Sequence, residues 1–265
     1  MKIQFILIVL TLSWVNIEAE AGKFLSEKPN FLNPCSVRGA GFKNCFVNNM
    51  DGILNEWRTG VPGLDSIGAI DPMDINHISI DGDPQSPMGI NLKLDDVKLS
   101  GISGARCSEA SFSTDPLGMS ALFDLSKITM KGEYNISGHI LEMPLEGNGQ
   151  AVISVDKIVV ELKIRFIRRQ EKDNLFLDVE RLRLDIHELS GLNLKFDNLF
   201  NGNSAQSTAA HKVLNENSST IFKVFRPSLN GAMGRLMKEY WSKIFAYIPA
   251  TYAFSDLPSV NARRG

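Results

Sequence analysis

The C-terminal stretch 208–247 constrains the fold of this chain more than any other part of the sequence. Its apolar residues recur mostly at steps of three and four, which places them along one side of a helix. One continuous helix of this length would span about 60 Å, and its apolar stripe needs cover along that whole length. The stripe consists of Ala210, Val213, Leu214, Ile221, Val224, Phe225, Met233, Leu236, Met237, Tyr240, Trp241, Ile244 and Phe245.

Pro227 lies in the middle of this helical pattern. Proline lacks the backbone N–H that a helix interior uses, so we expect a kink or an interruption there. Gly231 and Gly234 follow within two turns and weaken the helix further. A break at Pro227 would separate a packed half of the helix from a half that contacts a ligand.

Most of the chain upstream of this helix has the period-two alternation of amphipathic strands. The clearest strand covers 158–167 and returns at 175–186. The alternation changes phase near Asp95 and again after Val179, which indicates bulges or bends. Consecutive strands with short links form antiparallel sheets, and repeated bends make such a sheet strongly curved. We therefore predict an α+β fold in which a curved antiparallel sheet wraps the long helix.

The first 21 residues have the pattern of a secretory signal peptide. Lys2 gives a charged start, 3–15 form an apolar run, and 19–21 form a small-x-small cleavage site. The apolar run is shorter than the roughly 20 residues that a membrane-spanning helix needs. We therefore expect the mature chain 22–265 to be a single secreted domain, monomeric and extracellular.

Because a secreted protein is in an oxidising environment, its cysteines can form disulfides. Cys35 and Cys45 lie close together at the start of the chain, and Cys45 belongs to a helical pattern over 42–57. A disulfide between them would stabilise the fold by roughly 2–3 kcal/mol. Cys107 is then left over, and we interpret it as a small buried apolar residue. The alternative is an intermolecular bridge.

We find no residue pattern in this sequence that is typical of a metal site or a catalytic site. The four histidines are not spaced from other ligand residues as in a metal site, and Ser103 lacks the flanking glycine of a nucleophile elbow. We expect no metal, no cofactor and no enzymatic activity.

Charge also narrows the possible partners. A formal net charge of −2 lacks the basic footprint of a nucleic-acid-binding protein and gives no reason to expect stable membrane insertion or attraction to anionic lipid. Arg165, Arg168, Arg169 and Lys172 form a basic cluster, but acidic residues lie among them. We interpret this cluster as a solvated strand end, with a phosphate or head-group site as the alternative.

Two N-glycosylation sequons begin at Asn135 and Asn217. Asn135 points away from its apolar neighbours in the strand alternation, so we expect it to be accessible and glycosylated. Asn217 lies on the apolar stripe of the helix, so we expect it to be a buried polar contact and not a glycan site.

The interior between sheet and helix either packs solid or leaves a tunnel, and spacing alone does not decide between them. The residues that would line such a tunnel are apolar or aromatic and come from both the helix and the strands. They are Phe222, Phe225, Met233, Met237, Tyr240, Trp241, Ile136, Ile164, Phe166 and Leu184.

The mature chain resembles the insect takeout and haemolymph juvenile-hormone-binding family along nearly its whole length. The matching features occur in the order and at the distances typical of the family. They are Cys35 and Cys45, Gly60-Val61-Pro62 with Asp71-Pro72, the segments 134–138 and 143–149, Leu214-Asn215-Glu216-Asn217, Pro227 and Pro249.

This resemblance implies an elongated fold in which a curved sheet wraps a long helix, with a small apolar ligand in an internal tunnel. Juvenile-hormone carriers have a second disulfide, which cannot form here because only Cys107 remains. The chain therefore resembles the takeout branch more closely. That branch implies haemolymph or chemosensory fluid as the location and a link to circadian or feeding physiology.

Three functional hypotheses follow from these patterns. The first is a secreted, non-enzymatic carrier of a small hydrophobic ligand, such as a terpenoid or another lipid. The second is a membrane-surface lipid-binding protein of the bactericidal type, which would need a basic tip. The third is a secreted lipid-ester hydrolase, which would need a nucleophile–base pair.

Overall fold

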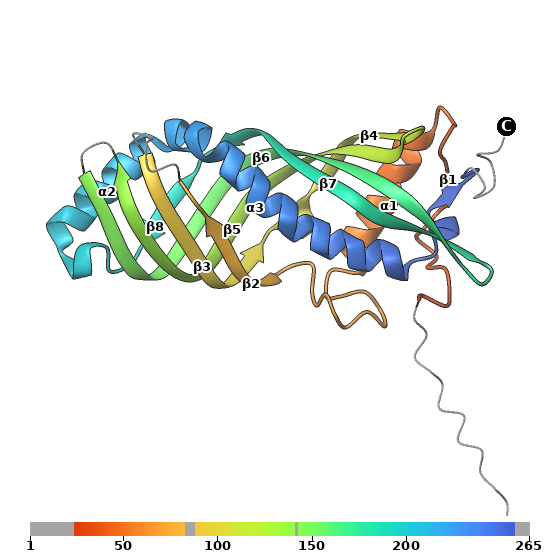
Figure 1. Cartoon of the computed structure of the whole chain (residues 1–265), viewed down its shortest axis with the longest axis horizontal. Coiled ribbons are helices and arrows are strands. Elements are labelled where there is room, and N and C mark those ends of the chain that lie inside the picture. Colours follow the sequence, from red (N-terminus) through yellow and green to blue (C-terminus); the bar gives the residue numbers. More distant parts are fainter. Residues whose placement is uncertain (1–23, 83–87, 141–142, 258–265) are drawn as a thin grey trace, which may run out of the picture.

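The computed structural model describes residues 24–82, 88–140 and 143–257. The predicted signal peptide, 1–21, lies outside these residues. Figure 1 shows an elongated molecule in which a curved antiparallel sheet occupies most of the length. The strands are β1 (Cys35–Ser36), β2 (Met73–Ile80), β3 (Met88–Ser100), β4 (Arg106–Thr114), β5 (Leu117–Ile140), β6 (Met143–Glu171), β7 (Asn174–Ser190), β8 (Asn193–Phe196) and β9 (Phe254–Ser255).

Within the described residues, the large sheet has the order β2-β3-β5-β6-β7. The short strand β4 pairs with β5, and β8 pairs with β6. Strands β5 and β6 contain 24 and 29 residues and are paired antiparallel along nearly their whole lengths. Their apolar residues alternate with polar ones, so one face of the sheet is dry and lines the inside of the curve.

Two of the predicted bends are confirmed as irregularities in strand register. The β3–β5 pairing shifts between Asp95 and Lys98, and Asp96 has a positive φ of 50°. The β6–β7 pairing shifts between Arg165 and Phe166, where Arg165 pairs with Arg181 and Phe166 with Val179. The extra residue at each shift turns the following side chains to the other face, which is the phase change visible in the sequence.

The predicted helix at 42–57 is confirmed as α1 (Phe42–Glu56). The stretch 208–247, by contrast, forms two helices, α2 (Ser204–Glu216) and α3 (Ser218–Tyr247), so the prediction of one continuous helix was wrong. The chain breaks at Asn217, whose side-chain amide donates to the carbonyl of Val213 and ends α2. Side chains of this kind compete with the helical backbone for hydrogen bonds.

Pro227 does not break the helix, which corrects the expectation of an interruption there. Pro227 and Lys223, one turn earlier, are both exposed. The carbonyl of Lys223 loses its helical donor, but it lies on the side of α3 that water can reach. The cost of proline at this position is therefore reduced, and tertiary contacts of α3 hold the helix together across it.

Helix α3 lies along the open side of the curved sheet (Figure 1). It contacts β7 at one edge of the sheet and β2 at the other. On the β2 side, the hydroxyl of Ser228 donates to the carbonyl of Asp81 at 3.1 Å. The helix thus completes a tube whose wall is otherwise sheet, with α1 toward one end and α2 at the other (Figure 1).

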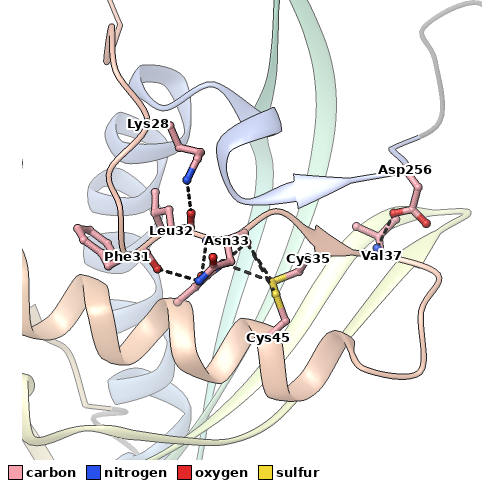
Figure 2. The surroundings of a disulfide bond; sticks show 9 residues. Lys28, Phe31, Leu32, Asn33, Cys35, Val37, Cys45 and Asp256 are labelled. Atoms are coloured by element: carbon pink, nitrogen blue, oxygen red, sulfur yellow. Dashed lines mark hydrogen bonds between the residues drawn. A yellow bond between two sulfur atoms is a disulfide. The ribbon is translucent and has the colours of Figure 1, made fainter.

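The predicted disulfide between Cys35 and Cys45 is present and ties β1 to the first turns of α1. Figure 2 shows its surroundings, where the N-terminal segment runs across α1 beside the C-terminal residues. β1 pairs in parallel with β9, and the amide of Val37 donates to Asp256 at 2.7 Å. Cys107 is buried without a disulfide, as expected for a small apolar residue, and burial raises the pKa of its thiol to about 11.

Within the described residues, no helix has both the length and the apolar character that crossing a membrane requires.

Candidate functional site

A cavity of about 300 Å³ lies inside the tube. Strands β2, β3, β5, β6, β7 and β8 and helices α1, α2 and α3 all contribute side chains to its wall. Every lining residue that the structure describes is apolar. The wall therefore offers dispersion contacts and desolvation, and no hydrogen bond from a side chain.

A second cavity of about 60 Å³ lies beside α1, toward the end of the tube that carries the disulfide. Asn49 is the one polar residue among its described lining side chains. The side-chain amide of Asn49 already has two hydrogen-bond partners. Its oxygen accepts from the backbone N–H of Asn33, and its nitrogen donates to the backbone carbonyl of Asn33, both at 2.8 Å. Asn49 thereby holds the N-terminal segment against α1.

The structure places most of the predicted lining residues around the larger cavity, on both the helix and the sheet. These are Phe222, Phe225, Met233, Met237 and Trp241 on α3, Ile136 on β5 and Leu184 on β7. Ile164 lines the smaller cavity instead, and Trp241 lines both.

Tyr240 and Phe166 line neither cavity, which corrects the prediction for these two residues. Met233, Met237 and Trp241 follow each other at steps of four and point to one side of α3, whereas Tyr240 is rotated by about 100° from Trp241. Phe166 lies just past a register shift and packs against the rings of Phe112 and Phe245.

Sequence reasoning missed the side chains that attach the helices to the sheet. On α2, the Asn215 amide accepts from the Leu194 N–H at 2.7 Å and donates to the Leu194 carbonyl at 3.0 Å. One turn earlier, His211 accepts from the Phe196 N–H at 2.9 Å. These side chains take the place of a neighbouring strand along β8, and they hold Leu214 of α2 against the end of the cavity.

Helix α3 is attached to the edge of β7 in a similar way. Asn230 accepts from the Ile186 N–H at 3.1 Å and donates to the Asp185 carboxylate at 2.8 Å. Arg226 also donates to Asp185, and this hydrogen bond is the main reason that the pKa of Asp185 is lowered. An asparagine in a helical pattern gives no signal of such a contact, because its partner is distant in sequence.

Ser103, which lacks the flanking glycine of a nucleophile elbow, has a structural role. Its hydroxyl and its backbone N–H both donate to the Asp71 carboxylate, which also accepts from the Gly101 N–H. Burial raises the pKa of Asp71, but these hydrogen bonds outweigh it and hold the pKa below its ordinary value. The carboxylate therefore fixes the loop between β3 and β4. In the described residues, no group of three or more potential metal ligands occurs.

The basic cluster contains ion pairs. Arg165 pairs with Glu180 at 3.1 Å, and Arg169 pairs with Asp178 at 2.8 Å. Arg169 also lies over the ring of Phe176 at 4.3 Å. These pairs account for two of the four cations, and they agree with a solvated strand end.

Both sequon asparagines are exposed. This agrees with the expected accessibility of Asn135 on β5, whose glycosylation stays a prediction. The expectation that Asn217 is buried was wrong, because the helix break at this residue turns it away from the apolar stripe.

A curved antiparallel sheet, closed by a long helix around an apolar cavity, defines an α+β protein of the tubular class. The chain belongs to the haemolymph juvenile hormone binding protein family, whose model matches residues 6–255.

Two curated relatives are described as circadian clock-controlled protein daywake. The one from Drosophila yakuba is 22% identical over 90% of this chain and 91% of its own length. The one from Drosophila melanogaster is 21% identical over 93% of this chain and 94% of its own length. The crystal structure of Takeout 1 from Epiphyas postvittana superimposes with a TM-score of 0.70 at 21% identity, covering 82% of this chain and 97% of that chain. This structural likeness shows a shared fold.

Proposed function

We propose that the mature chain, 22–265, is a single secreted domain that carries a small hydrophobic ligand and catalyses no reaction. The observation that carries this proposal is the cavity of about 300 Å³ with a wholly apolar described lining. A ligand that enters such a cavity loses its contact with water, at a gain of about 25 cal/mol per Å² of apolar surface. A terpenoid or another lipid has the matching chemistry.

Three further observations support this assignment. The family is named for binding proteins, and the fold is shared with Takeout 1. The Cys35–Cys45 disulfide suits an oxidising compartment, as does the sequence pattern of the first 21 residues. Since two relatives are described as circadian clock-controlled, a role linked to the clock or to feeding belongs to the same proposal.

Native mass spectrometry of protein secreted by insect cells tests the proposal. We expect a complex of one chain with a small apolar molecule, which is released when the protein is denatured and recovered in organic solvent. Protein stripped by that extraction and refolded should bind an added long-chain alcohol or terpenoid alcohol. A chain that carries no small molecule, and that binds neither probe after refolding, would rule out the carrier function.

A further inference from the structure

The larger and smaller cavities are separated by side chains that belong to both walls. Met50, Phe123, Leu162 and Trp241 each line the cavity of about 300 Å³ and also the cavity of about 60 Å³. They come from four elements, α1, β5, β6 and α3. We refer to these four residues as the diaphragm. Because they line both cavities, they lie where the two cavities adjoin, and an apolar chain that extends along the larger cavity toward the smaller one would end against them.

We infer that the diaphragm sets the length of the hydrocarbon chain that this protein accepts. The inference rests on the proposed carrier function and adds a specificity determinant to it. A length limit of this kind applies to a molecule with an unbranched or lightly branched apolar chain, and the apolar described wall of the larger cavity suits such a chain.

Three of the diaphragm residues are held in place by their surroundings. Phe123 pairs with Val160 and Leu162 with Ala121 in the central β5–β6 ladder. The centroid of the Trp241 ring lies 5.7 Å from that of Phe245 and 6.2 Å from that of Tyr240. A rigid strand pair and a packed indole leave little freedom to open a passage.

Met50 is the member that can move most easily. Methionine is unbranched and has three rotatable side-chain bonds, so it fills gaps and adapts its shape at low cost. Met50 is 4% exposed and lies on α1, which the disulfide and Asn49 fix to the N-terminal segment. Its side chain therefore extends from an anchored helix into the narrow part of the tube.

The space behind the diaphragm suits the end of a hydrocarbon chain better than a polar head group. Its described lining is apolar except for Asn49, whose amide is engaged with Asn33. A volume of about 60 Å³ corresponds to roughly two water molecules at about 30 Å³ each, or about two methylene groups. Opening the diaphragm should thus lengthen the accepted chain by a small, countable number of carbons.

The test compares Met50→Ala with Met233→Ala. Both variants remove the same side-chain atoms, but Met233 lines the larger cavity alone, whereas Met50 separates the two cavities. Dissociation constants are measured for a series of straight-chain alcohols of increasing length. In the unmodified protein, we expect the affinity to rise with each methylene and to stop rising at one limiting length.

In Met50→Ala, we expect the limiting length to increase by about two carbons more than in Met233→Ala, which corresponds to the added smaller cavity. Trp241→Phe should also increase the limiting chain length. This variant provides the test if Met50→Ala does not fold. Equal limiting lengths in the diaphragm variants and in Met233→Ala would overturn the inference while leaving the carrier function intact. If the unmodified protein binds no alcohol of the series, the inference fails, whereas the carrier function fails only if the terpenoid alcohol does not bind either and no small molecule co-purifies.

Discussion

At the scale of single residues, the buried Tyr134 and the partly buried Tyr240 differ in how their hydroxyl groups are satisfied. Tyr134 donates to the carbonyl of Asp197, whereas the Tyr240 hydroxyl has no hydrogen-bond partner among the described residues. A buried polar group without a partner costs about 1–3 kcal/mol, while a hydrogen bond that is made contributes about 0.5–1.5 kcal/mol. The same Tyr→Phe change should therefore have opposite consequences at the two positions.

We expect Tyr134→Phe to lower the free energy of unfolding by about 0.5–1.5 kcal/mol, because the Asp197 carbonyl loses its donor. Tyr240→Phe should leave the free energy of unfolding unchanged or raise it by up to about 1 kcal/mol, because it removes an unsatisfied hydroxyl. Urea unfolding of both variants measures these values. A larger loss in Tyr240→Phe than in Tyr134→Phe would mean that the Tyr240 hydroxyl has a partner that the side chains around it do not supply.

Alkaline pH gives an independent test of the same two residues. Burial raises the pKa of Tyr240 from 10.0 to about 12, and burial together with the nearby charge of Asp197 does the same for Tyr134. Between pH 10.0 and about pH 12, the phenolic groups have lost their protons in the unfolded chain but keep them in the folded chain. The stabilisation is therefore complete below pH 10 and falls as the pH rises toward 12. Tyr240→Phe should show a shallower fall in unfolding free energy over this range, and an identical slope would contradict the assignment.

Part of the cavity lining on α3 could be predicted from the sequence, and part of it could not. Steps of four residues identify Met233, Met237 and Trp241 as one face of a helix, and that face borders the cavity. Tyr240 has the same apolar character but lies on a neighbouring part of the helix surface. The rotation of α3 about its axis is set by contacts with β7, which the sequence of the helix does not contain.

At the scale of elements, local patterns identified the strands over 158–167 and 175–186 and the phase changes in the sheet, because alternation is local. The strand β4 and much of β5 were not predicted. The break in the long helix could not be placed in the same way. Pro227 is the strongest local helix breaker in the stretch, yet α3 continues through it. The break lies ten residues earlier, at Asn217, between α2 and α3. The position of the break depends on α2 lying against β8 at the end of the tube, which is a long-range contact.

Asn215 is the residue that we expect to hold α2 in that place. Asn215→Ala removes both hydrogen bonds to Leu194, and each partner group is then left for water to satisfy. We expect a loss of about 1–3 kcal/mol in the opening free energy of β8 and α2, which corresponds to a roughly fivefold or greater increase in amide exchange. Hydrogen exchange measured by NMR at Leu194 and Phe196 checks this prediction.

Lys212→Ala is the matched control on α2, because Lys212 is exposed and its contact with Glu216 is 4.0 Å long. It should leave exchange in β8 unchanged. If Asn215→Ala and Lys212→Ala have equal effects, or if exchange rises evenly across the whole sheet, the attachment of α2 through Asn215 does not have the proposed role.

At the scale of the whole molecule, the proposed carrier function requires that the tube encloses a ligand. The strand alternation predicted a curved sheet with a dry face, and the length of the helical pattern predicted an element to cover it. Neither decided between a solid core and a cavity, since both place the same side chains inside. That distinction depends on whether side chains such as Ala232 and Met233 fill the space between α3 and the sheet, which only the assembled structure reveals.

Ala232→Phe, compared with Ala246→Phe, tests the container most directly. Ala232 borders the cavity and Ala246 is exposed on the same helix, so one phenylalanine fills the cavity and the other remains outside. Binding of a long-chain alcohol to the stripped protein is measured by titration, and thermal unfolding checks that both variants are folded. We expect Ala232→Phe to weaken binding at least tenfold, which is about 1.4 kcal/mol, and Ala246→Phe to leave it unchanged. Equal affinity in both folded variants would contradict binding inside the tube and would place the ligand outside it.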